Sequence, residues 1–124
     1  MSSKVFRDVR EEVLFDGVTI TETVNSSAKT AQNVESAVFF LTIASWATLT
    51  SIDVKLQAQD PKTLAWFDLV GITFAQATGD TTEMVTNMIA TYGYPIPLGK
   101  FIRAVATVVG SGSAVVTLSM VAKS

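Results

Sequence analysis

The stretch Ser51–Gly71 alternates between apolar and polar residues and then turns back on itself. Its first half places Ile52, Val54 and Leu56 on one face and polar or charged residues on the other, which is the pattern of a β-strand with one buried face. Asp60–Thr63 (DPKT) supplies turn residues, because Asp bonds to its own backbone and Pro presets φ. A second apolar run follows. The stretch therefore predicts a β-hairpin that crosses a buried core, with the other strands packed around it.

Most of the remaining chain also reads as short strands. Ser36–Ile43 is apolar on both faces, which predicts a central strand or one that a neighbour covers. Lys100–Val109 and Ala114–Ala122 flank a Gly/Ser turn at Gly110–Ser113 and predict an antiparallel pair. Met84–Tyr92 fits either a helix or a strand, and we assign it as a strand because every other element is β.

About eight short strands and no convincing helix predict an all-β fold, an antiparallel β-sandwich of the jelly-roll type. With 124 residues, the chain has the length of one domain. We expect residues 13–124 to form the sandwich and the charge-rich residues 1–12 to form an N-terminal arm. This arm is either a frayed terminus or a segment that orders against a neighbouring subunit, with Phe6 as its apolar anchor.

Composition adds an expectation about partners. Charged residues make up 16% of the chain, against about 25% in typical soluble domains, and the mean hydropathy is +0.40. Either the core contains an unusually large share of the residues or apolar surface is shared with another chain. We therefore expect a homo-oligomer, a dimer or a trimer. The basic residues are scattered, which argues against nucleic acid as a partner. The longest apolar run, Ala37–Ala44, is too short to cross a membrane.

The sequence offers little for catalysis. It contains no His and no Cys, which removes imidazole bases, imidazole metal ligands and thiol chemistry. The candidate carboxylates fall in turns or at polar strand positions, where a solvated role suits them: Asp53, Asp60, Asp68, Asp80 and Glu83. Loop oxygens can bind Ca²⁺, but no loop has the dense acidic spacing of such sites. We therefore expect no enzymatic activity, no metal and no cofactor.

Aromatic residues are the better candidates for binding. Trp66 and Phe67 are adjacent and point to opposite faces of a strand, so we expect one of them at an interface or under a loop. The Tyr- and Pro-rich loop after residue 91 either stacks on a sugar or protein partner or packs its tyrosines locally. Arg103, among apolar neighbours, is either a paired charge on a sheet face or a ligand contact. The candidate partner-binding residues are Val5, Phe6, Arg7, Trp66, Tyr92, Tyr94, Pro95 and Arg103.

Two stretches resemble a class of small phage structural proteins: IDVKLQAQDPKTLAWFDLVGITFAQATG and, later, GKFIRAVATVVGSGSAVVTLSMVAK. The shared pattern is a D-V-x-L-Q…W-x-D-L…F-x-Q hairpin, then an F-I-R-A-V strand and a Gly/Ser turn, over about residues 51–123. The resemblance implies a virion protein, above all a capsid decoration (cement) protein. Such a protein is a small β-rich oligomer that binds the major capsid protein on the surface of the assembled head. The absence of Cys and of a signal-peptide-like start fits assembly in the host cytoplasm.

Two alternatives stay open. One is a phage tail or neck component. The other is a carbohydrate-binding module, because W-F-D-L followed by K-F-I-R-A is similar to the later strands of discoidin-like, galactose-binding jelly rolls. In that case Trp66, Tyr92 or Tyr94 would be the stacking platform, although this chain is shorter than most such modules and has no His for the contacts they often use.

Overall fold

The computed structural model describes residues 9–89 and 94–123, and this part of the chain forms strands and no helix. The prediction of an all-β fold is confirmed. The strands are β1 (Val9–Ile20), β2 (Val24–Asn25), β3 (Lys29–Thr30), β4 (Ser36–Ala47), β5 (Ser51–Gln59), β6 (Trp66–Thr73), β7 (Thr81–Thr86), β8 (Met88–Ile89), β9 (Tyr94–Pro95), β10 (Phe101–Val109) and β11 (Ser113–Lys123).

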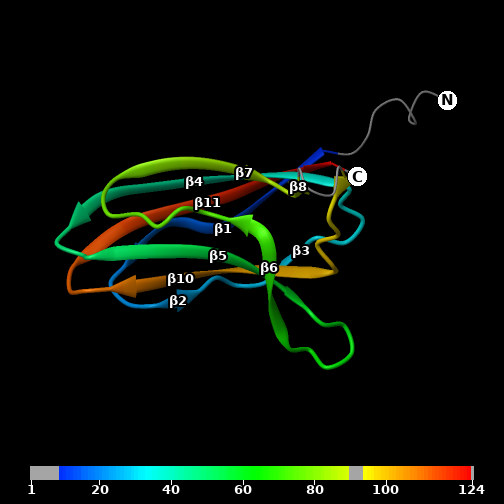
Figure 1. The fold of residues 1–124 in the computed structure, drawn as a ribbon, viewed down its shortest axis with the longest axis horizontal. Coiled ribbons are helices and arrows are strands. Elements are labelled where there is room, and N and C mark those ends of the chain that lie inside the picture. Colours follow the sequence, from blue (N-terminus) through cyan, green and yellow to red (C-terminus); the bar gives the residue numbers. More distant parts are fainter. Residues whose placement is uncertain (1–8, 90–93, 124) are drawn as a thin grey trace.

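The strands lie in two antiparallel sheets that face each other (Figure 1). One sheet has the order β1-β11-β4-β7, and the other has the order β2-β10-β5-β6 with β3 also paired to β10. Strands β2 and β3 pair with successive parts of β10, so together they act as one interrupted strand. Counted this way, and leaving aside the small β8–β9 pair, the chain has eight strands and changes sheet at every step except between β5 and β6, as in a jelly roll. The predicted architecture is confirmed.

The core lies between the two sheets and follows from the period-two pattern. Every second residue of β11 is buried, and the same alternation occurs in β4 and in β5. From the four-stranded sheet, Phe39, Leu41 and Leu118 enter the core; from the other sheet, Ile52 and Leu56 meet them. Each of these side chains is at most 2% exposed. Burial of this apolar surface is the main force that holds the layers together.

One corner of the sandwich requires glycine. The turn between β10 and β11 packs on the turn between β4 and β5, where the Thr50 N–H donates to Val109 O at 2.9 Å and Thr48 Oγ1 donates to Ser111 O at 2.8 Å. At Gly112, with φ +143°, an added Cβ would lie 1.9 Å from Ala47 O. No other residue type fits this approach of two backbones without displacing one of them.

Some predicted boundaries were wrong. Strand β1 begins at Val9 and pairs with β11 from its first residue, so Val9–Glu12 belong to the sandwich rather than to the predicted arm. The segment predicted as one strand over Met84–Tyr92 instead contains the end of β7, Asn87 and β8, and its last three residues lie outside the described part. Asn87 interrupts the strand because its backbone and side chain bond to neighbouring segments.

Candidate functional site

The hairpin formed by β5 and β6 projects beyond the body of the sandwich (Figure 1). Its turn is closed by backbone hydrogen bonds: the Asp60 N–H donates to Ala65 O at 2.8 Å, and the Leu64 N–H donates to Asp60 O at 2.9 Å. Asp60 Oδ1 also accepts the Lys62 N–H at 2.8 Å, as predicted for an Asp at the start of a turn. This hydrogen bond, the largest contribution, and a further bond with Thr63 hold the pKa of Asp60 below its ordinary value. The projection is therefore an ordered element.

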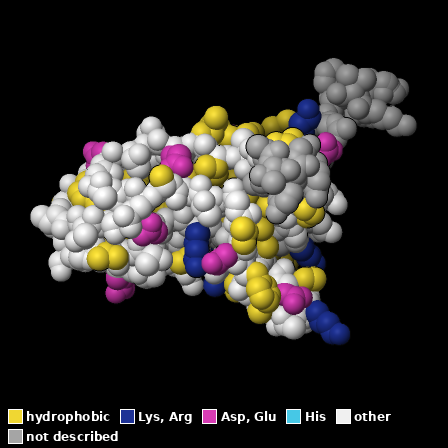
Figure 2. All heavy atoms as spheres, viewed as in Figure 1, with side chains coloured by type: hydrophobic (Ala, Val, Ile, Leu, Met, Phe, Trp, Pro, Cys, Tyr) yellow, Lys and Arg dark blue, Asp and Glu magenta, His cyan; other side chains and the backbone are white. Residues whose placement is uncertain are grey.

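This hairpin carries three exposed apolar side chains, Leu64, Phe67 and Val70, which are 62%, 59% and 81% exposed. We call them the hairpin surface. Phe67 pairs with Ala58 and so belongs to the side of the hairpin that continues the core-facing side of β5. It is exposed because the hairpin has passed the end of the core. Figure 2 shows hydrophobic side chains gathered on this projection. Exposed apolar side chains on an ordered projection are typical of a protein–protein contact.

A β-bulge places Val70 at this surface. The pairing of β5 with β6 shifts between Lys55↔Thr73 and Gln57↔Asp68, so that β6 contains three residues more than its partner over this step. Gly71 lies in the bulge with φ +90°, a conformation that glycine adopts readily. The bulge leaves the residues on either side of Val70 and Gly71 buried while Val70 itself points into solvent.

A chain of polar contacts covers the outward face of the same hairpin. Lys55 Nζ lies 3.0 Å from Asp68 Oδ1, which also accepts Gln57 Nε2 at 2.9 Å. Gln57 Oε1 in turn accepts Arg103 Nε at 2.8 Å. The guanidinium carbon of Arg103 lies 4.5 Å from the centroid of the Trp66 ring, a cation–π contact. The hydrogen bond from Gln57 and then that from Lys55 lower the pKa of Asp68.

Two of the predicted binding residues, Trp66 and Arg103, are thus brought together on β6 and β10. Trp66 and Phe67 do lie on opposite faces of the hairpin, as predicted, with Trp66 half-buried and Phe67 exposed. The indole shares one ring face with Arg103, which reduces the area that it offers to a sugar.

The other candidates do not join this pair. Val5, Phe6, Arg7 and Tyr92 lie outside the described residues, so their predicted role stays a prediction. Tyr94 and Pro95 form β9, which pairs with Met88 and Ile89 in a small sheet of its own rather than with the hairpin. The sequence reading missed Leu64 and Val70. A leucine directly after turn residues was a signal for the first, but the bulge that exposes Val70 has no clear signal.

The carboxylates are engaged in local structure rather than gathered into a site. Asp53 Oδ2 accepts Gln76 Nε2 at 3.0 Å, Asp80 Oδ1 accepts the Trp46 N–H at 3.0 Å, and Glu83 Oε1 accepts the Ala75 N–H at 3.0 Å. Among residues 9–89 and 94–123, no three His, Cys, Asp or Glu side chains are close enough to bind a metal ion together. No helix in these ranges has the length and hydropathy to span a bilayer.

Comparison with known proteins finds similarity in structure only. No protein-family model and no curated protein matches the sequence. The solved structure of the SPBc2 prophage-derived protein YomS is similar over 96% of both chains, with a TM-score of 0.55 and 13% sequence identity. A chain in the structure of infectious bursal disease virus (Gx strain) is similar with a TM-score of 0.63 and 13% identity. That match covers 96% of this chain but 32% of the viral one. These similarities show that the chain shares its fold with a prophage-derived protein and with part of a viral protein.

Proposed function

We propose that this chain is a phage virion structural protein, a decoration (cement) protein that binds the outside of an assembled head as an oligomer. The observation that carries the proposal is the ordered hairpin that projects from the sandwich and presents Leu64, Phe67 and Val70 to solvent. Apolar side chains on a projection can enter a recess between neighbouring shell subunits while the body remains outside. Such a recess exists only in the assembled lattice.

The fold and the comparisons support this role. Jelly rolls are common in viral capsid proteins, and both of the structural neighbours described above come from a prophage or a virus. Fold alone does not determine function, so the hairpin surface carries the proposal. A ligand that binds only the assembled shell stabilises that shell by mass action, and an oligomer with several attachment points adds avidity.

The experiment is cosedimentation with shells assembled from the coat protein that the same genome encodes. The wild-type chain is expected to sediment with assembled shells but not with free coat subunits. The variant Phe67→Ser/Val70→Ser should lose most of this binding. Val109→Ser is a matched control, because Val109 is 50% exposed at the end of β10 and lies outside the hairpin surface.

Four outcomes would contradict the proposal. Shells that leave the wild-type chain in the supernatant would exclude the decoration role. Equal binding of the hairpin variant and the wild type would exclude the hairpin as the attachment point. Antibody labelling of virions on tails or necks instead of heads would favour the tail alternative, and retention on a glycan array would favour the carbohydrate-binding alternative.

A further inference from the structure

The outer face of the four-stranded sheet carries no charge over eleven positions on three adjacent strands. These positions share the outward side of β11, β4 and β7, as their cross-strand pairing shows. We call them the uncharged face. They are Val115, Thr117, Ser119, Val121, Val38, Phe40, Thr42, Ala44, Thr82, Met84 and Thr86.

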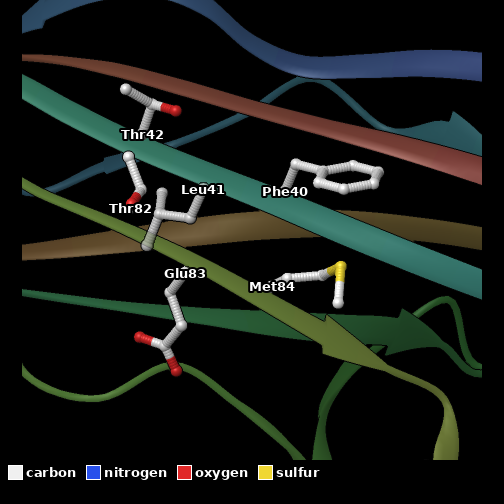
Figure 3. Close-up of a pocket in the computed structure, with 6 residues that line it drawn as sticks. All are labelled: Phe40, Leu41, Thr42, Thr82, Glu83 and Met84. Atoms are coloured by element: carbon white, nitrogen blue, oxygen red, sulfur yellow. The ribbon is translucent and has the colours of Figure 1, made fainter.

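Phe40 and Met84 form the apolar centre of this face. They pair across β4 and β7, and their side chains lie beside each other (Figure 3). Phe40 is 41% exposed and Met84 is 62% exposed. Together with Leu41, Thr42, Thr82 and Glu83 they border a shallow hollow of about 340 Å³. The carboxylate of Glu83 belongs to the other side of β7 and accepts the Ala75 N–H at 3.0 Å. A methionine is flexible enough to adapt to an incoming side chain, so this centre can both fill a recess and provide one.

The opposite sheet differs in its chemistry. Its outer face carries Asp53, Lys55, Asp68 and Arg103, and these charges are engaged by neighbouring polar or aromatic groups. Removing such charges from water is costly, whereas the threonine and serine hydroxyls of the uncharged face can hydrogen-bond to one another or to trapped water. Interface cores are likewise depleted in charged residues. Of the two outer faces, the uncharged one can be dehydrated at lower cost.

β4 points to the same conclusion. Its sequence is apolar on both sides, which is typical of a central strand or of one that a neighbour covers. The opposite sheet covers Phe39, Leu41 and Ile43, but Phe40 on the other side is exposed. The described part of this chain does not cover this second side, so any cover comes from another molecule.

We propose that this cover is a second copy of the chain, packed face to face through the uncharged face about a two-fold axis close to Phe40 and Met84. A two-fold interface brings a surface against itself, so any charge near the axis would meet its own copy and be repelled. An uncharged surface avoids this repulsion, whereas it offers a charged partner nothing complementary. This inference rests on the proposed function for its role on a shell, but it is tested on the isolated protein.

The available area fits a reversible dimer. Three strands spaced about 4.8 Å apart give a width of about 14 Å, and the steps from Val115 to Val121 on β11 give a length of about 20 Å. The uncharged face therefore covers about 300 Å² per copy, or about 600 Å² for the pair, which is the size of a weak, transient interface. An interface of this size is expected to have a Kd on the order of 100 µM.

The first experiment needs no substitution. Sedimentation velocity of the full chain, from about 1 µM to about 500 µM, should show a monomer that converts to a dimer as concentration rises. A mass that stays monomeric throughout overturns the inference. A second titration follows the two variants Phe40→Lys and Phe40→Glu, each of which should be at least about tenfold weaker in self-association, because a charge at the axis meets its own copy.

Mixing the two Phe40 variants in equal amounts is the sharpest test, because only a face-to-face pair places Lys of one copy near Glu of the other. The mixture should dimerise more strongly than either variant alone. Val109→Lys, which adds the same charge to the other sheet, should dimerise like the wild type. Should a Phe40 variant fail to fold by circular dichroism, Met84→Lys and Met84→Glu repeat the test at a more exposed position.

The outcomes separate this inference from the proposed function. If the Phe40 variants dimerise like the wild type, another surface mediates self-association and the inference is wrong. If the Phe40 variants are monomeric and still bind shells through the hairpin, with lower avidity, both proposals hold. If the wild type dimerises as described but does not bind shells, the inference about the dimer holds and the decoration role is wrong.

Discussion

The guanidinium carbon of Arg103 lies 4.5 Å from the centroid of the Trp66 ring, although 37 positions separate the two residues (103 minus 66) in the chain. They meet because β10 and β6 lie on either side of β5, so that Arg103 and Trp66 are both on strands next to the one that carries Gln57. A partly exposed cation–π contact contributes about 0.5–1 kcal/mol.

We expect a double-mutant cycle with Arg103→Gln and Trp66→Leu to give a coupling free energy of about 0.5–1 kcal/mol in urea unfolding. The same cycle with Val109→Ala in place of Trp66→Leu should give a coupling near zero, because no contact joins Val109 to Arg103 in the described structure. Additive single and double variants would show that the contact makes no energetic contribution.

Asn87 is expected to make a measurable contribution to the stability of the fold. It is 1% exposed, its Oδ1 accepts the Ala37 N–H at 2.9 Å, and its Nδ2 donates to Glu35 O and Ile96 O at 3.0 and 3.1 Å. Asn87→Ala leaves these three backbone groups without their partner, so we expect the free energy of unfolding to fall by about 2–4 kcal/mol. Thermal and urea unfolding measure this loss. Asn25→Ala, at an exposed strand position, should change stability by less than about 0.5 kcal/mol.

A substitution at Gly112 tests how closely the two turns have to pack at their corner of the sandwich. An added Cβ would lie 1.9 Å from Ala47 O and 2.4 Å from Thr48 Oγ1, at a φ of +143°. Gly112→Ala should therefore cost more than about 3 kcal/mol, or prevent folding altogether. Gly79→Ala is the control, since nothing lies within 4 Å of its added Cβ. Comparable stability of the two variants would show that the corner can relax.

Acid stability should depend in part on Asp68 and Asp60. Hydrogen bonds lower the pKa of both carboxyls in the folded chain, with Gln57 the main cause for Asp68 and the Lys62 N–H for Asp60. The unfolded chain, with an Asp pKa of about 3.9, therefore takes up protons first as the pH falls. Their contribution is present above that pH and is lost as the pH falls through the lower, folded-state pKa values.

The effect should be small, because both side chains are exposed and screened by solvent. Urea midpoints of the wild type and Asp68→Asn, measured between about pH 6 and about pH 2.5, should converge as the pH falls. A constant difference between the two proteins over this range would mean that the carboxylate charge of Asp68 has no role.

The sequence predicts the layers of this fold better than its surfaces. The alternation along β5 and β11 is enough to assign their buried faces, and the Asp60 turn is recognisable from its residue types. Strand order is different, because it depends on which segments pair far apart in the chain. That is why the contact between Trp66 and Arg103 could not be foreseen. Nor could the exposure of Val70, which depends on a bulge that three extra residues create.

The uncharged face and the projecting hairpin belong to opposite layers of the sandwich. In a pair joined through the uncharged face, four sheets are stacked and the two hairpins lie on the outermost layers, about 30 Å apart at sheet spacings of about 10 Å. The two hairpins of such a pair can therefore bind at two attachment points on opposite sides of it. A force that pulls these two points apart would act perpendicular to the two joined faces. It would be shared by eleven side-chain positions on each copy, so that no single contact has to resist it alone.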